Sequence, residues 1–218
     1  MGVFAGPEIS NDGLVLALDA GNPMSYPGSG NTWTDLSGRG NNAAMGSGRT
    51  YSSANGGSLV FDGTTNYAIV SLPSATSYNT FTYNVWVYST NNSGYHTIID
   101  QGNDTWFFGI FNGQLITFNP SFSSGYFINT NQWYNLGVTH VIGGPVLFYV
   151  NGNLVYTSTN DSSNFTTSYF GIGGGVVSPT SANEIWSGNI AQVSIYNRAL
   201  SAAEVSQNYN ALRGRYGI

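Results

Sequence analysis

Residues Gln132–Ser158 read QWYNLGVTHVIGGPVLFYVNGNLVYTS, and this stretch decides the fold. It contains three runs of strand length separated by two turn signals. In the first run, large residues recur at every second position and therefore share one face of a strand. The pair Gly143-Gly144 then predicts a turn, because glycine adopts backbone conformations that other residues avoid. The residues on the shared face are Tyr134, Leu136, Val138 and His140.

The second half of the stretch predicts a tight hairpin. Val146–Val150 is rich in β-branched and aromatic residues, which fit a pleated surface. Asn151-Gly152 follows at once, and both residues tolerate the positive φ of a type I′ turn. Leu154–Tyr156 returns as the third strand. The three strands form a local antiparallel meander that can set the register of the rest of the sheet.

Charged residues are scarce in this chain. They make up 7% of 218 residues, against about a quarter in average domains, and the formal net charge is −5. Lysine is absent and the basic residues are five scattered arginines, so the sequence lacks the cationic patch that nucleic acid binding requires. Solubility must come from Asn, Ser, Thr and Gly. Such an uncharged polar surface suits β proteins that contact sugars or other proteins.

Length and hydrophobic content favour one domain with a substantial core, since 41% of the residues are hydrophobic. The absence of cysteine excludes disulfides and thiolate metal sites. The N-terminal residues lack the basic and apolar regions of a secretory signal, and no apolar run reaches membrane-spanning length. We therefore expect that the protein does not insert into a membrane and that it is assembled in the cytoplasm of a host cell.

Strand-like segments with turn signals between them continue along the chain, without helical alternation. This pattern predicts an all-β sandwich. Residues 19–57 form a long irregular stretch in which Trp33 and Leu36 are the expected anchors. We divide the chain into an N-terminal arm, residues 1–12, and one domain, residues 13–218. The further predicted strands are residues 14–18, 58–62, 67–72, 80–88, 96–100, 105–111, 114–118, 169–172 and 185–196.

One helical pattern occurs near the end of the chain. Ser201 and Glu204 have the spacing of a capping box, in which each side chain bonds the other residue's backbone N–H. Leu200 is placed to pack on Val205 as a hydrophobic staple. We expect a short helix that is ended by Gly214 and packs on the edge of the sandwich.

Six segments, in this order, resemble the laminin G-like domains of the concanavalin A-like lectin/glucanase jelly rolls. They are SLVFDGTTNYAIV, FTYNVWVYS, NQWYNLGVTH, VLFYVNGNLV, FGIGGG and SGNIAQVSIYNRALSAAEV. The ending NRALSAAEVSQNYNALRGRYGI, together with ALDAGNPMSYPGSGNTWTDLSG, looks like the variant common in bacteriophage structural proteins. The resemblance implies a two-sheet antiparallel jelly roll and a binding or decoration role on a virion.

Members of this family often carry calcium, and the chain departs from that pattern at Asn66 and Gln192, where acidic residues are common. We therefore expect no required cofactor and little stabilisation by calcium. The best remaining oxygen cluster is the loop that runs from Asp100 to Asp104, whose two carboxylates and two amides could hold a calcium ion. The alternative, which the spacing favours, is a hairpin loop whose side chains bond their own backbone.

Glucanase relatives use two closely spaced carboxylates on one strand, because acid and nucleophile must flank a single glycosidic bond. This chain has three glutamates, Glu8, Glu184 and Glu204, in three separate regions. His96 and His140 lack a neighbouring serine and aspartate that would indicate a triad, and His140 is expected in the core. We therefore predict that the protein is not an enzyme.

The stretch Trp106–Phe111 carries large apolar side chains on both faces. A sandwich strand should bury only one face, so the excess suggests a stacking platform for sugar rings or a contact with another subunit of a homo-oligomer. The alternative is that loops cover the second face. The candidate ligand-binding residues are Trp106, Phe108, Tyr126, Trp186, Asp100 and Asn103.

The two ends of the chain carry aromatic and arginine residues, which are enriched in protein interfaces. We expect them to anchor the domain on virion structural proteins, leaving the loops free to meet cell-surface glycans. The anchoring residues are Phe4, Arg213, Arg215, Tyr216 and Ile218.

The sequence thus predicts a non-enzymatic virion surface protein, either a capsid decoration or a tail-fibre component, with weak glycan binding. The main alternative is a free-standing carbohydrate-binding module or lectin. The third hypothesis is a glycoside hydrolase of the glucanase type.

Overall fold

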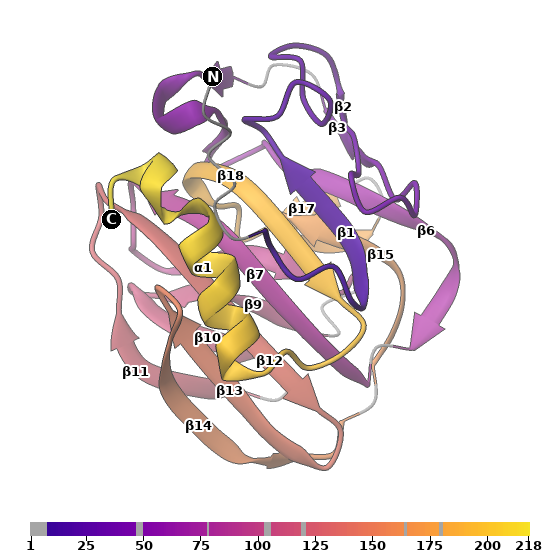
Figure 1. The fold of residues 1–218 in the computed structure, drawn as a ribbon, viewed down its shortest axis with the longest axis vertical. Helices are drawn as coiled ribbons and strands as arrows, with labels where there is room; N and C mark the ends of the chain where they lie inside the picture. The colour runs from indigo at the N-terminus through magenta and orange to yellow at the C-terminus, as the bar shows by residue number, and fades with distance from the viewer. Residues whose placement is uncertain are drawn as a thin grey trace.

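The structure is a computed structural model that describes residues 8–46, 50–77, 79–102, 106–118, 121–163, 165–178 and 181–218. Most of these residues form strands, which pack as two antiparallel sheets with one helix outside them (Figure 1). This arrangement confirms the prediction of a two-sheet antiparallel jelly roll with one C-terminal helix. Among the described residues, no helix is both long enough and apolar enough to cross a membrane.

Sheet A has the strand order β14-β13-β12-β7-β18-β5-β4, and β1 pairs with β18 outside that path. The predicted meander is β12, β13 and β14, and it joins the rest of the sheet because β12 also pairs with β7. The strand bounds are β1 Leu14–Asp19, β4 Thr50–Ser52, β5 Ser58–Asp62, β7 Thr80–Ser89, β12 Trp133–Val141, β13 Gly144–Val150, β14 Asn153–Asp161 and β18 Ser187–Tyr196.

Sheet B has the order β11-β10-β9-β8-β15-β6-β3-β2, and a separate hairpin is formed by β16 and β17. The strand bounds are β2 Thr32–Trp33, β3 Ala43–Met45, β6 Ala68–Ser77, β8 Tyr95–Asp100, β9 Phe107–Phe111, β10 Gln114–Phe118, β11 Phe122–Phe127, β15 Thr166–Ile172, β16 Gly175–Ser178 and β17 Ser181–Asn183.

The turns of the meander follow the sequence closely. Asn151 and Gly152 have φ values of 49° and 75°, which confirms the predicted two-residue hairpin. The earlier turn lies one residue before its predicted place, because β12 extends to Val141 and Gly144 already begins β13. Gly143 alone of the predicted glycine pair has a positive φ, 76°.

The core lies between the sheets and confirms the predicted inner face of β12. His140 is fully buried, stacks on Phe81 with ring centroids 5.1 Å apart, and places its Nε2 3.0 Å from Oδ2 of Asp161. This confirms the expectation of a core histidine. The alternating large residues of β7 also point inward, and each is fully buried: Phe81, Tyr83, Val85 and Val87.

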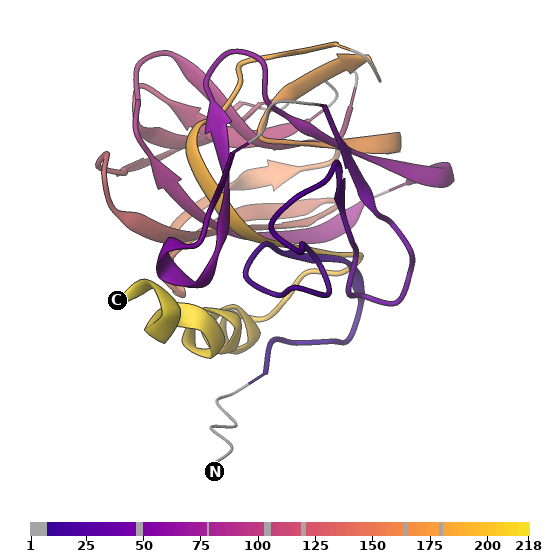
Figure 2. The ribbon, with the colours of Figure 1, turned by 90° about the horizontal axis from the view of Figure 1, so that it is seen from above.

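The helix α1, Ala202–Tyr216, lies across the outer face of sheet A rather than on the edge of the sandwich (Figure 2). The predicted edge position is wrong because the outer face of sheet A is itself apolar. Trp86 projects from β7 toward the helix, and its ring lies 4.1 Å from that of Tyr216 and 5.7 Å from that of Tyr209. The central strand β7 is therefore buried on both faces of sheet A.

The start of α1 confirms the predicted capping signals. The Ser201 side chain accepts a hydrogen bond from the backbone N–H of Glu204, and the Glu204 carboxylate accepts one from the backbone N–H of Ser201. Leu200 and Val205 belong to one buried cluster, as expected for a hydrophobic staple.

The end of α1 lies beyond its predicted position. The helix continues through Gly214 to Tyr216, and Gly217 forms the left-handed cap with φ 74°. Ending the helix at Gly214 would leave Tyr216 without its position against Trp86. Packing on sheet A therefore overrides the glycine signal at position 214.

The stretch of residues 19–57 is shaped by polar contacts as well as by short strands. Trp33 is fully buried, as predicted, but Leu36 is 40% exposed and does not anchor the loop. Asp35 anchors it instead. Its Oδ1 accepts a hydrogen bond from the backbone N–H of Ala17, and its Oδ2 accepts one from the backbone N–H of Asn41.

Candidate binding site

The aromatic stretch that leads into β9 is divided between the two faces of sheet B. Trp106 and Phe108 point inward and are fully buried, with the Trp106 ring 4.8 Å from that of Phe81. The prediction that Trp106 and Phe108 bind a ligand is therefore wrong, because both lie between the sheets. Phe107 and Phe111 belong to the opposite face, which turns away from the core.

The outer face of sheet B carries aromatic residues in two rows. Residues paired across antiparallel strands lie side by side on one face, so the register places side chains of four strands together. Between the aromatic rows runs a third row that contains Gly109. Because glycine has no side chain, the surface is lower there than at the rings on either side. The outer rows are Tyr95, Phe111, Gln114 and Phe127, and then Asp100, Phe107 and Phe118; the middle row is Thr97, Gly109, Ile116 and Ser123.

The rings of these rows contact one another and remain partly exposed. The ring of Tyr95 lies 4.3 Å from that of Phe111 and meets Phe107 edge-on at 6.3 Å. Phe107 in turn stacks on Phe118 at 5.6 Å. Tyr95, Phe111 and Phe118 are 41%, 37% and 43% exposed, whereas Phe107 is nearly buried and forms the floor. We call the surface formed by these four residues the aromatic groove.

Two adjoining pockets, of about 230 Å³ and about 200 Å³, open along the aromatic groove and share Tyr95 and Phe118. The second pocket extends over β10 and β11, where Gln114 and Ser123 add neutral polar groups. Apolar rings beside neutral hydrogen-bonding groups can hold a ligand that has both an apolar face and hydroxyl groups.

The rim of the first pocket is formed by Asn183, the last residue of β17, and by Glu184, which follows it. The β16–β17 hairpin packs on the outer face of sheet B through Val176. The backbone N–H of Thr97 donates to the carbonyl of Glu184 at 2.7 Å, and the Thr97 hydroxyl donates to Oε2 of Glu184 at 3.2 Å. The rim is thus fixed to β8 by both backbone and side chain.

The other candidate ligand residues lie apart from the groove. Trp186 is fully buried with its ring edge-on to His96, so its predicted ligand role is wrong. Tyr126 is half-buried against the core, and burial, followed by the nearby Tyr134, raises the pKa of its hydroxyl. Asn103 lies outside the described residues.

The loop that begins at Asp100 agrees with the hairpin alternative. Asp100 is fully buried, and its Oδ2 accepts hydrogen bonds from the backbone N–H groups of Gly102 and Val176 at 2.9 and 3.0 Å. A carboxylate used in this way organises its own loop and the neighbouring hairpin. Asp104, the second predicted metal ligand, lies outside the described residues.

The residues present do not fit a calcium site of the family type. Burial raises the pKa of the Asp62 carboxyl, but hydrogen bonds outweigh it and hold the pKa well below its usual range. They come from the backbone N–H groups of Thr64, Thr65 and Asn66 and from the Thr65 hydroxyl. Gln192 is almost fully buried. Within the described ranges, no group of three or more acidic or histidine side chains is placed to hold a metal ion.

The C-terminal residues have roles in folding that the anchoring hypothesis did not foresee. Tyr216 is 5% exposed under its stack with Trp86, so it is not available to a partner. Arg215 pairs with Asp19, with Nη1 2.7 Å from Oδ1. The structure contradicts an anchoring role for Tyr216 and gives Arg215 an internal partner. Arg213 and Ile218 are exposed, and Phe4 lies outside the described residues.

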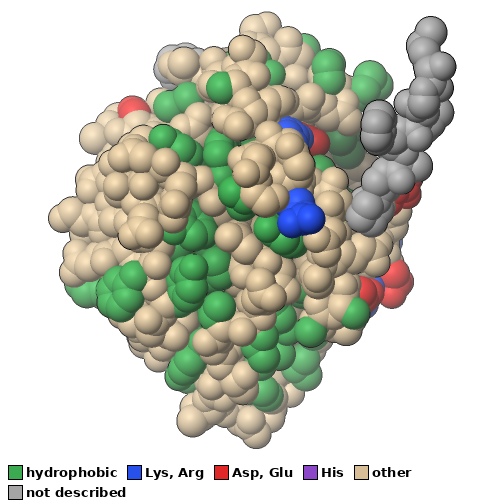
Figure 3. Space-filling model, turned by 60° about the vertical axis from the view of Figure 1, so that its left-hand side comes forward, with side chains coloured by type: hydrophobic (Ala, Val, Ile, Leu, Met, Phe, Trp, Pro, Cys, Tyr) green, Lys and Arg blue, Asp and Glu red, His purple; other side chains and the backbone are tan. Residues whose placement is uncertain are grey.

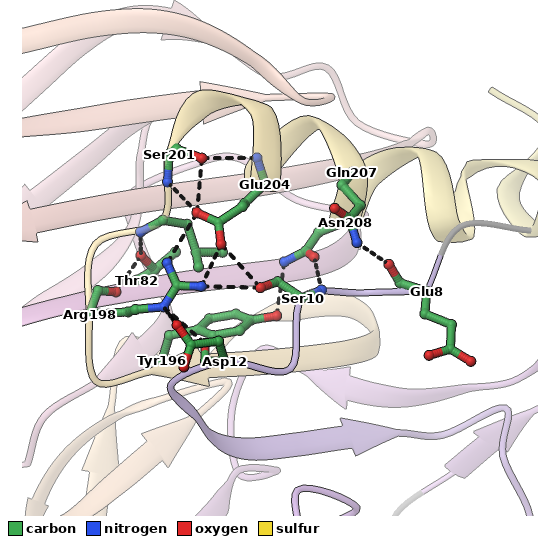
Figure 4. Close-up of polar contacts among 11 residues, drawn as sticks. Glu8, Ser10, Asp12, Thr82, Tyr196, Arg198, Ser201, Glu204, Gln207 and Asn208 are labelled. Atoms are coloured by element: carbon green, nitrogen blue, oxygen red, sulfur yellow. Dashed lines mark hydrogen bonds and ion pairs between the residues drawn. The ribbon is translucent and has the colours of Figure 1, made fainter.

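The described part of the N-terminal arm, residues 8–12, is held by α1 and by Arg198, which lies in the segment between β18 and α1 (Figure 4). The backbone N–H of Ser10 donates to Asn208 Oδ1 at 2.8 Å, and Gln207 Nε2 donates to the carbonyl of Glu8 at 2.7 Å. Arg198 lies between Asp12 and the helix-capping Glu204 and pairs with both. Residues 8–12 therefore belong to the folded unit.

None of the four groove residues, Tyr95, Phe107, Phe111 and Phe118, was among the predicted site residues, although Phe107 and Phe111 lie in the aromatic stretch that the sequence singled out. Glu184, on the rim, was not among them either. The available signal was that β9 is aromatic on both faces and that its neighbours also carry aromatic residues at the strand ends. Glu184 is distant from all of them in sequence, so only the fold brings it to the groove.

The family profile described as Concanavalin A-like lectin/glucanases superfamily matches residues 62–206. Among solved structures, the chain resembles domain 4 of AbnA, a GH43 extracellular arabinanase from Geobacillus stearothermophilus, in complex with arabinotriose. That match has a TM-score of 0.67 and 19% identity and covers 90% of this chain and 98% of the other. No curated protein matches the sequence.

Binding domains of botulinum neurotoxins are also similar. The receptor-binding domain of type G matches with a TM-score of 0.68, 17% identity and coverage of 91% of this chain and 51% of the other. The binding domain of botulinum neurotoxin DC, in complex with rat synaptotagmin II, matches with a TM-score of 0.70 and 18% identity. That match covers 93% of this chain and 52% of the other. The chain thus spans about half of these toxin domains. These identities show a common fold, and the profile match over more than half of the chain shows the family: the protein belongs to the concanavalin A-like lectin/glucanase superfamily.

Proposed function

We propose that this protein is a non-enzymatic, glycan-binding domain whose binding site is the aromatic groove. One observation carries the proposal. Among the described residues, the exposed large hydrophobic side chains that are aromatic all belong to β8–β11, on the outer face of sheet B. They are Tyr95, Phe111, Phe118 and Phe127.

A saccharide suits this surface better than a purely apolar ligand does. Pyranose and furanose rings have one apolar C–H face, which can rest on an aromatic ring, and hydroxyl groups at the periphery. Gln114, Asn183 and Glu184 offer hydrogen-bonding groups around the rings. Two solved structures of similar fold support this reading, since one was solved with arabinotriose and the other in a study of ganglioside interaction by botulinum neurotoxin type C.

The absence of a carboxylate pair in the groove favours binding over hydrolysis. Among the described residues that line its two pockets, Glu184 is the one carboxylate. Asp100, which lies in the same row as Phe107 and Phe118, is fully buried and accepts two backbone hydrogen bonds. Glycosidases of this superfamily's type need two carboxyl groups that both reach the scissile bond.

The proposal extends to a setting, the surface of a virion, as a capsid decoration or tail-fibre component. It rests on the resemblance of the C-terminal and N-terminal segments to phage structural proteins and on the low content of charged residues, 7% of the chain. On the face that Figure 3 shows, charged side chains are few. Mass spectrometry of purified particles tests this part. We expect the protein at a fixed stoichiometry, and its absence from particles would favour a free-standing carbohydrate-binding module.

Binding itself is tested on a glycan array with the wild-type protein and the variants Tyr95→Ala and Phe118→Ala. Loss of one stacking ring should weaken binding about fivefold, since such contacts contribute about 1 kcal/mol each. Leu154→Ala is the matched control, because Leu154 is 50% exposed on β14, away from the groove. Equal loss in all three variants, or in none, would contradict the proposed site. Size-exclusion chromatography of the same variants would reveal whether the groove is instead a contact between subunits.

A further inference from the structure

A second pocket with aromatic walls lies on the other side of the sandwich, on the outer face of sheet A. Its volume is about 230 Å³. Trp133 of β12 pairs with Tyr88 of β7, and Tyr88 pairs with Asn189 of β18, so the three side chains lie in one row across the sheet. We call this cavity the sheet A pocket. Its other lining residues are Ser52 of β4, Ser58 of β5, and Ala54 and Asn55 of the short 3₁₀ helix η1, Ala54–Gly56.

Trp133 and Tyr88 give the sheet A pocket its apolar surface. Their ring centroids lie 5.6 Å apart and their planes are inclined by 54°, so the two rings form a corner. Tyr216 of α1 supports Trp133, with 4.7 Å between the ring centroids. Trp133 and Tyr88 both remain partly exposed and both line the pocket. A ligand that enters the pocket therefore meets aromatic surface.

Neutral amides and hydroxyls form most of the remaining lining. Nδ2 of Asn189 donates to Oγ of the fully buried Ser58 at 2.9 Å, which fixes the orientation of this amide. Asn55 is exposed and contributes a second amide from η1. An asparagine amide has two N–H donors and a carbonyl acceptor. The two amides can therefore both donate to and accept from the hydroxyl groups of a ligand.

The wall that carries Asn55 is held in place by the end of α1. Arg215 donates from Nε to the carbonyl of Asn55 at 3.1 Å and from Nη2 to the carbonyl of Gly57 at 2.9 Å. Nη1 of the same guanidinium pairs with Asp19. A Cβ at Gly56 would lie 2.8 Å from Nε of Arg215, so the wall packs closely on this side chain. The pocket is thus preformed, and a ligand does not have to order it on binding.

The backbone of this wall is left-handed at three consecutive residues. Asn55, Gly56 and Gly57 have φ values of 51°, 75° and 113°. Glycine adopts such conformations without steric cost, and asparagine tolerates them better than most residues do. Asparagine at position 55 therefore adds an amide to the pocket at a place where glycine would satisfy the backbone.

We propose that the sheet A pocket is a second saccharide-binding site, which takes one sugar residue of a glycan chain. The apolar C–H face of the sugar rests on Tyr88 or Trp133, while its hydroxyl groups exchange hydrogen bonds with Asn55 and Asn189. Pockets for drug-sized ligands measure about 300–1,000 Å³, so a cavity of about 230 Å³ suits a single sugar ring.

The sheet A pocket is independent of the aromatic groove. The two sites share no residue and lie on the outer faces of different sheets. The rings of Tyr88 and Trp133 are less exposed than those of Tyr95 and Phe118, so we expect the sheet A pocket to be the weaker site. The inference stands or falls separately from the function proposed for the groove.

Tryptophan fluorescence reports on the sheet A pocket and not on the groove. Trp133 is the one partly exposed tryptophan of the five, and the aromatic groove contains tyrosine and phenylalanine. Acrylamide, a collisional quencher, therefore reaches Trp133 in preference to the others, and a sugar in the pocket should shield it. The four fully buried tryptophans are Trp33, Trp86, Trp106 and Trp186.

The test measures acrylamide quenching while single probes are titrated: the methyl glycosides of glucose, galactose, mannose and N-acetylglucosamine, and arabinotriose. At least one probe should reduce the quenching of the wild-type protein in a saturable manner. Asn55→Gly should need about fivefold more of that probe for the same protection, the effect of one lost hydrogen bond. Failure of every probe to give saturable protection would overturn the proposal.

Asn131→Gly is the matched control. Asn131 also has a positive φ, 64°, and does not line the sheet A pocket. Both glycine variants should keep melting temperatures close to that of the wild type, because glycine adopts positive φ readily. Asn131→Gly should leave the protection of Trp133 unchanged. Equal loss of protection in the two variants would assign the effect to the backbone and would overturn the proposal.

The double variant Tyr95→Ala, Phe118→Ala separates this inference from the proposed function. It should lose glycan-array binding at the groove but keep the protection of Trp133. If the double variant loses that protection and Asn55→Gly keeps it, the inference is wrong and the groove stands. If array binding survives in the double variant but falls in Asn55→Gly, the groove assignment fails and the sheet A pocket stands.

Discussion

Replacing Tyr216 by alanine should destabilise the whole domain, although only two residues of the sequence follow it. The ring is 5% exposed and its centroid lies 4.1 Å from that of Trp86 and 4.7 Å from that of Trp133. Truncation of a buried aromatic residue to alanine typically costs about 3–5 kcal/mol. Since the last turn of α1 can shift to close part of the cavity, we expect roughly 2–4 kcal/mol. For a domain of this size that corresponds to a fall of roughly 4–16 °C in melting temperature.

Tyr216→Phe is the matched variant, because the Tyr216 hydroxyl is buried without a hydrogen-bond partner among the described residues. Removing an unsatisfied buried hydroxyl should leave stability unchanged or raise it by about 1 kcal/mol. Thermal unfolding followed by circular dichroism measures both variants, with Ile218→Ala as an exposed control. A melting temperature for Tyr216→Ala within about 1 °C of the wild type would refute the packing argument. It would also return Tyr216 to the list of residues free to anchor a partner.

Three further predictions concern the turn, a buried histidine and calcium. Gly152→Val should lower the free energy of unfolding by about 1–2 kcal/mol, because Gly152 has φ 75° and a Cβ there would lie 3.0 Å from Cβ of Tyr209. An unchanged midpoint of urea unfolding would contradict the turn geometry. Burial, only partly offset by Asp161, lowers the pKa of His140 below its ordinary value of 6.5. The stabilisation by neutral His140 is therefore fully present above pH 6.5 and is lost as the pH falls toward the folded-state pKa. An unfolding free energy that stays constant on acidification would count against this. Millimolar calcium should change the melting temperature little, since Asp62 uses its oxygens within its own turn, and a rise of many degrees would show that other oxygens bind the ion.

The sequence was sufficient to predict the parts of the fold that depend on local signals. The Asn151-Gly152 turn, the alternation along β7 and the capping box at Ser201 each involve residues close together in the chain. Such signals specify a conformation before any long-range contact forms. The family resemblance then placed these elements in two sheets, as the structure has them.

Local sequence signals could not predict which face of β9 points into the core. Because β9 and its preceding tryptophan are apolar on both faces, alternation does not tell which face is the inner one. The pairing of β9 with β8 and β10 decides it, and it sends Trp106 and Phe108 inward. The same reason explains Trp86, whose outward position became buried only when α1 crossed sheet A.

The groove was likewise assembled by contacts that the sequence does not announce. Glu184 reaches Tyr95 because the segment after β17 runs beside β8, where Thr97 bonds its carbonyl. Tyr216 appeared to belong to a free end because its stacking partners lie far away in the chain. In both cases tertiary packing fixed the role of the residue.

The location of the glycan site is the central claim, and chemical-shift mapping by NMR tests it most directly. The best-bound saccharide from the array is titrated into isotope-labelled protein, and the amide shifts are followed residue by residue. The account predicts that the largest changes cluster on β8–β11 and at Asn183 and Glu184, with little change along α1. Shifts concentrated instead around the pocket of about 330 Å³ between the N-terminal arm and α1, lined by Ile9, Leu36 and Leu212, would contradict it.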